Sequence, residues 1–188
     1  MGETYINIDS RLYYRLLHPK LVALLVTRGK DGKVNVMTVA WFMPISITPP
    51  LLVVSISRRR FSYRLLMDTR EFTLCVLTKD MLKEAHFCGT VSGSSVDKVK
   101  ALGLRLGESA AVKVPWIIGC AAALECRVRE VIKVSTHDLV VGEILAARVR
   151  RDLFKGRRYT NGAPLLYHMG GSFYTTLSNE VLTPQSRE

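Results

Sequence analysis

Apolar segments separated by turn residues dominate the sequence and predict a mainly β protein. Each of the first four segments is rich in Val, Leu, Ile or Thr, as strands are. These segments are Leu21–Thr27, Lys33–Phe42, Leu51–Ser57 and Glu71–Leu77. Gly29-Lys30-Asp31-Gly32 lies between the first two, where it predicts the turn of a β-hairpin.

The second half of the chain predicts two long, bent strands. Trp116–Val134 is long for a single strand, and Gly119 marks an expected bulge or kink within it. A turn at Ser135–Asp138 then leads into Leu139–Arg150, where Gly142 indicates a second bend. Long bent strands joined by hairpins are typical of barrels.

Helical patterns are short and local. They predict helices over Phe61–Met67, over Lys79–Phe87 with an end at Gly89, and over Asp97–Leu102 with an end at Gly103. Strands do not alternate regularly with long helices, which argues against a Rossmann sheet. The fold class expected is therefore mainly β, a closed or split Greek-key barrel with short helices.

The 188 residues predict one domain over residues 1–177, followed by a polar C-terminal tail over residues 178–188. Hydrophobic residues make up 48% of the chain, enough for a core. No apolar run approaches the roughly 20 residues that cross a bilayer. Met1-Gly2-Glu3-Thr4 lacks a secretory pattern, and Ile6 stands where myristoylation needs Ser or Thr. We expect a cytoplasmic protein with no membrane partner.

The four cysteines do not predict disulfides or a metal site. No CxxC pair occurs, and free cysteines in apolar stretches pack as small hydrophobes. Cys120 and Cys126 are expected on one face of a strand, too far apart to bridge. His86-Phe87-Cys88 has no second pair of ligands nearby in the sequence, so metal binding is not expected.

The formal net charge of +11 indicates an anionic partner. The partner could be a nucleic acid, a phosphate-bearing cofactor or an acidic protein. A basic surface that is only solvated would explain the charge as well. Nucleic-acid binding by a β-barrel needs aromatic residues interleaved with basic ones. Arg58–Arg60 and Arg148–Arg151 have only Phe61 and Phe154 close by, so no nucleic-acid partner is predicted.

The sequence contains no signature of side-chain catalysis. It has no nucleophile elbow, no phosphate loop and no GxGxxG opening a helix. Acidic residues are few, and Glu125 and Glu143 have the positions of structural residues in strands. An enzyme with this inventory needs a cofactor to supply its reactivity. We therefore predict no catalytic side chains.

One candidate binding segment runs along the second predicted strand. Alternation places Asn35, Met37, Val39 and Trp41 on one face and Val36, Thr38, Ala40 and Phe42 on the other. Small residues at Thr38 and Ala40 would let a flat ring approach the backbone. The same pattern also fits an ordinary sheet with a few polar residues at its end.

A second candidate segment follows the third predicted strand. Ser55-Ile56-Ser57-Arg58 precedes Phe61-Ser62-Tyr63 at an expected helix start. Hydroxyls, backbone N–H groups at a helix N-terminus and an arginine together make a phosphate site. Simple capping by Ser57 or Ser62 beside a solvated arginine loop explains the segment equally well.

Taken together, the segments resemble the flavin reductase-like, FMN-binding split-barrel family, which includes the flavoredoxins. The similarity runs in order from about His18 to about Tyr174. Its fragments are His18-Pro19, Asp31 to Asn35, Thr38, Ala40-Trp41, Pro44, Ser46, Pro49-Pro50, Ser55 to Ser57, Thr69 to Phe72, Cys88-Gly89, Ser92-Gly93, Asp97-Lys98, Val141 to Glu143, Pro164-Leu165, Tyr167-His168 and Gly170-Gly171. Cys75 departs from the polar residue expected in its strand.

The resemblance implies noncovalent FMN and a homodimer with FMN near the subunit interface. It places the flavin ring against the strand Asn35, Met37, Thr38, Val39, Ala40 and Trp41. It places the phosphate near Ser55, Ile56, Ser57, Arg58, Ser62 and Tyr63, with Ser92, Gly93 and Lys98 nearby. Ser92-Gly93 also fits a plain turn. Tyr167 and His168 would contact the ring or simply pack in a C-terminal strand.

Two functions follow from this resemblance. The first is an NAD(P)H-dependent FMN oxidoreductase, in which NADH or NADPH delivers hydride to the flavin and the electrons are passed on. The second is a flavoredoxin-like electron carrier with little nicotinamide activity, whose basic surface would dock an acidic redox protein.

Overall fold

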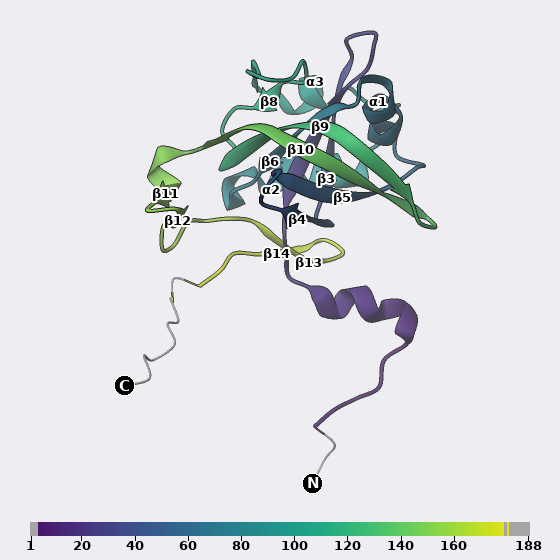
Figure 1. Cartoon of the computed structure of the whole chain (residues 1–188). Coiled ribbons are helices and arrows are strands. Elements are labelled where there is room, and N and C mark those ends of the chain that lie inside the picture. Colours follow the sequence, from purple (N-terminus) through teal and green to yellow (C-terminus); the bar gives the residue numbers. More distant parts are fainter. Residues whose placement is uncertain (1–3, 179, 181–188) are drawn as a thin grey trace.

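Seven antiparallel strands form the main sheet, in the order β3-β2-β6-β9-β10-β5-β4 (Figure 1). The computed structural model describes residues 4–178 and residue 180. The strands of this sheet are β2 (Ala23–Arg28), β3 (Val34–Val39), β4 (Phe42–Ser46), β5 (Leu51–Ser57), β6 (Glu71–Val76), β9 (Ala122–Lys133) and β10 (His137–Val149). The mainly β prediction is confirmed.

The two edge strands of the sheet, β3 and β4, are consecutive in the chain. The sequence predicted one strand over Lys33–Phe42, but Ala40 and Trp41 interrupt it and β4 then pairs with β5. Trp41 O accepts a hydrogen bond from Ser55 N at 2.9 Å, which holds the interruption against β5. The sheet therefore curls until its first and last strands meet end to end, and within the described residues it is split at this joint.

Glycines produce the bends of the long strands. The predicted strand Trp116–Val134 is broken at Gly119, whose φ is +100°, into β8 (Trp116–Ile117) and β9. Gly142 coincides with a register shift between β9 and β10, and a Cβ there would overlap the Phe72 ring. The turn predicted at Ser135–Asp138 was too long, because β10 already begins at His137.

Three α-helices occur where short helices were predicted. They are α1 (Phe61–Thr69), α2 (Leu82–Thr90) and α3 (Lys98–Leu102). Helix α2 continues through Gly89, where its end was predicted, and a 3-10 turn η2 (Lys79–Met81) precedes it. Helix α3 begins after Asp97, whose side chain accepts from Lys100 N, and ends at Gly103 with φ +61°.

Smaller elements surround the sheet. Two of them matter below: the N-terminal 3-10 helix η1, which was not predicted, and the C-terminal hairpin β13–β14, which pairs with β1 and of which only a strand at Tyr167 and His168 was considered. The small elements are η1 (Ser10–Leu17), β1 (Lys20–Leu21), β7 (Leu106–Gly107), β8, η3 (Arg151–Leu153), β11 (Phe154–Lys155), β12 (Arg158–Tyr159), β13 (Tyr167–Gly170) and β14 (Phe173–Thr175). No helix in the described part of the chain is long and apolar enough to cross a membrane.

Both faces of the central strands are buried. Met37 and Val39 pack into the cluster inside the curved sheet, and Val36 packs into the cluster beneath α2, so the predicted alternation is present within β3. Phe42, predicted on the face of Val36, packs against the cluster of Met37 instead, because the strand is interrupted before it. Cys120 and Cys126 were predicted on one face but lie in different clusters, because Cys120 precedes the strand. All four cysteines are buried and free.

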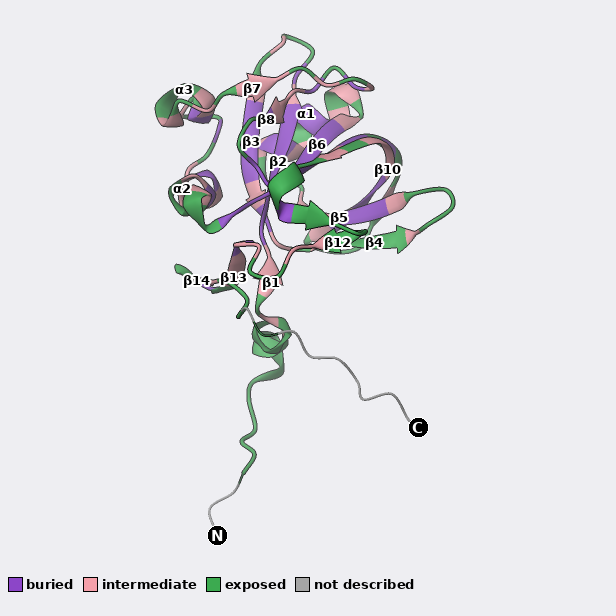
Figure 2. Ribbon diagram, turned by 90° about the vertical axis from the view of Figure 1, so that its left-hand side faces the viewer, coloured by how far each residue is buried: buried purple, intermediate pink, exposed green. Residues whose placement is uncertain are grey.

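The one-domain division of the sequence stays a prediction. The predicted tail, residues 178–188, lies outside the described residues except for Ser178 and Glu180. Figure 2 shows that η1 lies away from the sheet, on the side of β1 and the β13–β14 hairpin. These exposed elements are considered below as an interface.

Candidate cofactor-binding site

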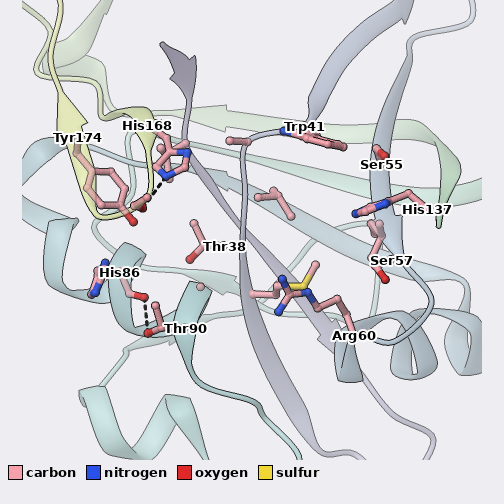
Figure 3. A pocket seen from close by; sticks show the side chains of 17 residues that line it. Thr38, Trp41, Ser55, Ser57, Arg60, His86, Thr90, His137, His168 and Tyr174 are labelled. Carbon is pink, nitrogen blue, oxygen red and sulfur yellow. Dashed lines mark hydrogen bonds between the residues drawn. The ribbon is translucent and has the colours of Figure 1, made fainter. Parts of the chain in front are cut away.

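A cavity of about 370 Å³, here called the sheet cavity, opens at the joint between β3 and β4 (Figure 3). Strands β3 and β5 form one wall, and α2 and the β13–β14 hairpin form another. Nine of the predicted site residues line it: Met37, Thr38, Val39, Ala40, Trp41, Ser55, Ile56, Ser57 and His168. Its volume is in the range of small-molecule sites.

A second cavity of about 220 Å³, here called the basic cavity, adjoins the first. Met37, Arg60 and Thr90 line both. Five further predicted residues line the basic cavity: Asn35, Ser62, Ser92, Gly93 and Lys98. A cavity of about 400 Å³ at the turn between β2 and β3 contains none of the predicted residues. The predicted site therefore corresponds to two adjoining spaces at one end of β3.

Lys98 lies at the inner side of the basic cavity and is 4% exposed. Its Nζ donates to Val36 O at 2.8 Å and to Cys88 O at 2.9 Å, which ties α3 to β3 and α2. Burial lowers the pKa of Lys98. No carboxylate forms an ion pair with it among the described residues. A buried cation held only by neutral carbonyls is stabilised by an anion placed beside it.

Asn35 and Ser62 connect β3 to the first turn of α1. Both side chains are buried, and Asn35 Nδ2 donates to Ser62 Oγ at 2.7 Å. Gly93 packs so closely on Asn35 that a Cβ there would overlap the amide. Ser62 does not cap α1, whose first residue follows Arg60 with no side-chain cap bond. This contact fixes three of the predicted residues around the basic cavity.

Arg58 and Tyr63 do not line either cavity, contrary to their predicted place beside the phosphate. Arg58 Nε donates to Asp138 Oδ1 at 2.8 Å, and the Tyr63 hydroxyl donates to Asp138 Oδ2 at 2.6 Å. The hydrogen bond from Tyr63 and then that from Arg58 lower the pKa of Asp138. Arg60 lines both cavities instead. Arg58 and Tyr63 are thus attached to β10 and brace the loop before α1.

Tyr167 also lies away from the sheet cavity. It packs with Leu21, Tyr159 and Ala163 against the small cluster that contains Leu153 and Leu165. The neighbouring His168 points to the other side of β13 and lines the cavity. Of the two C-terminal residues predicted together, the structure therefore brings only His168 to the site.

Several lining residues were missed. His137 stacks on Trp41 with ring centroids 5.3 Å apart and an interplanar angle of 34°. Tyr174 lies 5.2 Å from His168 and 6.2 Å from His86, centroid to centroid. The missed residues of the sheet cavity are Val22, Arg60, His86, Gly89, Thr90, His137, Gly171 and Tyr174. An isolated His or Tyr gives no periodic signal, so only a three-dimensional arrangement identifies them.

The residues fit a flat ring with an anionic tail. Backbone and side chains of β3 line the sheet cavity, while a buried ammonium, the two arginines Arg59 and Arg60, and hydroxyls line the basic cavity. Glu125, expected to be structural, is buried and pairs with Arg148 outside both cavities. The described residues contain no cluster of three metal-ligating side chains. The site is therefore suited to a phosphorylated cofactor.

Comparison with known proteins decides the family. The sequence profile of the flavin reductase like domain matches residues 14–176. The chain belongs to this family. A protein of Archaeoglobus fulgidus with no described function is 39% identical over 98% of this chain and all of its own length. The NADH-dependent FAD reductase of Streptomyces globisporus is 29% identical over 68% of this chain and 72% of its own.

Solved structures of flavin reductase-like proteins have the same fold. The FMN-binding protein from Thermus thermophilus with bound 1-cyclohex-2-enone has a TM-score of 0.86 and 28% identity, over 97% of this chain and 99% of that one. Flavoredoxin from Methanosarcina acetivorans has a TM-score of 0.84 and 26% identity, over 98% and 97%. The resemblance noted in the sequence and the split-barrel fold are confirmed.

Proposed function

We propose that the chain binds FMN noncovalently across the two cavities. The observation that carries this proposal is Lys98, a buried ammonium without a described carboxylate partner in a cavity that adjoins a ring-sized space. Its charge suits the phosphate. The FMN-binding protein from Thermus thermophilus, with the same fold, supports the choice of cofactor.

The phosphate group lies in the basic cavity in this proposal. Lys98, Arg60, Ser62 and Ser92 would hold it, because ammonium, guanidinium and hydroxyl groups are its usual donors. Ser57 and Thr90, at the junction with the sheet cavity, would contact the ribityl chain. Arg58 and Tyr63 act through Asp138 and not by contact with the phosphate.

In this proposal the isoalloxazine ring lies in the sheet cavity, against Thr38–Trp41 at the end of β3 and the joint that follows it. The Thr38 hydroxyl already donates to Ala85 O of α2, so the backbone of this segment is the group available to the polar edge of the ring. Backbone N–H groups at the joint between β3 and β4 would stabilise negative charge on a reduced ring. The stacked pair of Trp41 and His137 would limit the ring at one edge.

We further propose that bound FMN accepts hydride from NADH or NADPH and passes the electrons on. FMN supplies this reactivity itself, which agrees with cavities that contain no acid–base pair of carboxylates. The protein's part is to hold donor and ring in line and to exclude water. The NADH-dependent FAD reductase of Streptomyces globisporus supports this donor.

A second candidate function is an electron carrier that docks another protein. The net charge of +11 favours an acidic redox partner, and the flavoredoxin from Methanosarcina acetivorans has the same fold. Rapid reduction by NADH or NADPH favours the first function. Slow or absent reduction, with rapid reduction by an acidic redox protein, favours the second.

We also propose a homodimer. Helix η1 has no buried residue and exposes Leu12, Leu16 and Leu17 on the side of the protruding β13–β14 hairpin (Figure 2). An exposed apolar helix at the edge of a site is typical of a surface that another chain covers. A second copy is the occupant expected from the family resemblance.

Titration of the purified protein with FMN and with riboflavin tests the cofactor assignment. We expect tight binding of FMN and at least about tenfold weaker binding of riboflavin, because hydrogen bonds to a charged phosphate contribute roughly 1.5–3 kcal/mol each. Anaerobic stopped-flow reduction with NADH and NADPH then follows the flavin absorbance. Protein that binds neither flavin would contradict the proposal.

A further inference from the structure

All four histidines of the chain gather at the sheet cavity. His86, His137 and His168 line it, and His18 packs against His168 with ring centroids 5.3 Å apart. Tyr174 lies between His168 and His86. Trp41 and Arg60 are on the opposite side, beyond Thr38 (Figure 3). We call Tyr174 and His168 the hairpin wall, because both come from β13–β14.

The hydrogen bonds of this wall determine which groups it offers. His168 Nε2 lies 3.0 Å from Gly171 O, and a carbonyl only accepts, so this nitrogen carries a hydrogen. His18 Nδ1 likewise donates to Tyr14 O at 3.0 Å. These bonds hold both rings in place. They leave the Tyr174 hydroxyl as the wall's free donor.

The Tyr174 hydroxyl points toward the middle of the cavity in Figure 3. The side chain is half-buried, and burial raises the pKa of Tyr174, so the phenol stays protonated at neutral pH. The Arg15 guanidinium packs against Gly170 of the hairpin and does not line the cavity. The hairpin wall therefore offers a neutral donor among aromatic rings, with no fixed cation.

We propose that the hairpin wall binds a small conjugated carbonyl compound, such as an enone or a quinone, and that Tyr174 donates a hydrogen bond to its oxygen. This compound would be the acceptor of the electrons that reduced FMN passes on. A neutral O–H donor beside flat rings recognises a neutral, flat, oxygen-bearing ligand, whereas a carboxylate would need a cation. This inference rests on the proposed function.

The reaction balances with one proton from the wall. Reduced FMN, when bound, would supply a hydride to the carbon conjugated with the carbonyl and would itself be oxidised. The π pair displaced onto the carbonyl oxygen would take one proton from the Tyr174 hydroxyl, and solvent would restore that proton to Tyr174. The hydrogen bond places the oxygen, and so fixes which carbon faces the flavin.

Binding of 4-hydroxyacetophenone to the oxidised, FMN-loaded protein tests the proposal without turnover. We expect the carbonyl stretch of the bound probe, measured by Raman difference spectroscopy, to shift to lower frequency than in an aprotic solvent. In Tyr174→Phe this shift should disappear and Kd should rise about three- to tenfold, the effect of one hydrogen bond. The matched control, Tyr159→Phe, removes a phenol outside the cavity and should change neither.

Measuring FMN affinity first distinguishes a failure of the proposed function from a failure of the inference about the hairpin wall. If wild-type protein fails to bind FMN, the proposed function is wrong. If FMN binds equally to wild type and Tyr174→Phe, but the probe does not bind or its stretch and Kd are the same in both, the inference about the hairpin wall is overturned. If Tyr174→Phe changed the KM for NADH but left binding of the probe unaltered, the inference would also be overturned.

Discussion

The two walls of the sheet cavity rest on different supports. The strand wall, Thr38–Trp41 with Ser55–Ser57, is built on the seven-stranded sheet, and its buried residues Val39 and Ile56 pack into the core cluster inside the curved sheet. The hairpin wall belongs to a separate three-stranded sheet, and Phe173 beside it is 73% exposed. A wall fixed by a core suits a resident cofactor, and a wall held by a few contacts suits a ligand that comes and goes.

The largest effect is expected at Lys98, behind the strand wall. Lys98→Met keeps the length of the side chain but removes the ammonium from Val36 O, Cys88 O and the proposed phosphate. FMN affinity should fall roughly 10- to 100-fold, because a hydrogen bond to a charged group contributes about 1.5–3 kcal/mol. Fluorescence titration with FMN measures this.

The matched control for Lys98→Met is Lys100→Met, on the same short helix. Lys100 is exposed and lines neither cavity, so its loss should leave FMN affinity unchanged. Riboflavin has no phosphate, and its affinity should fall less than that of FMN in Lys98→Met. Equal losses for the two flavins would mean that Lys98 supports the fold and not the phosphate.

The next effect is expected at Asp138, which joins the loop before α1 to β10. Asp138→Asn weakens the acceptor of both Arg58 and Tyr63, so Arg60 and the first turn of α1 lose their brace. We expect FMN affinity to fall about fivefold, with lower thermal stability. Asp152→Asn, in a surface pair with Arg150, is the control and should change neither.

Asp138 also predicts a pH dependence of stability. Its pKa in the folded protein is lowered, mainly by the hydrogen bond from Tyr63. Its contribution is therefore complete above the ordinary aspartate value of about 3.9 and is lost as pH falls through the lower, folded value. Denaturation midpoints of wild type and Asp138→Asn should differ at pH 7 and converge in strong acid. A constant difference would contradict this assignment.

The run Arg58–Arg60 shows which features of the site the sequence predicts and which it does not. The hairpins, the bend glycines and the binding strand follow from local patterns such as Gly29–Gly32. Which members of Arg58–Arg60 line the cavities does not follow from local patterns. Asp138, far along the chain, pairs with Arg58, whereas Arg59 and Arg60 line the basic cavity. His137 and Tyr174 reach the cavity only through the pairing of β10 and β14, which isolated residues do not encode.

A smaller effect is expected at Arg60. Its side chain is exposed, so solvent screens its charge. Arg60→Gln should weaken FMN binding about two- to fivefold and reduce the salt dependence of the affinity. Arg58→Gln should leave the salt dependence as in wild type, because Asp138 already neutralises that arginine. Titrations at low and high salt separate the two variants, and the opposite ranking would restore Arg58 as the phosphate ligand.

The smallest effect on FMN is expected from the outer face of the hairpin wall. Phe173→Ser replaces a side chain that is 73% exposed and lines neither cavity, so FMN affinity should stay within about twofold.

The same variant tests the dimer. If η1 and this hairpin form the dimer interface, the solution mass of Phe173→Ser from light scattering should fall toward that of one chain on dilution. Thr176→Ser, a mild change next to β14, should keep the wild-type mass. A dimer that persists in Phe173→Ser together with Leu16→Ser would place the interface elsewhere, because the most exposed apolar side chain of the hairpin and that of η1 would then be absent.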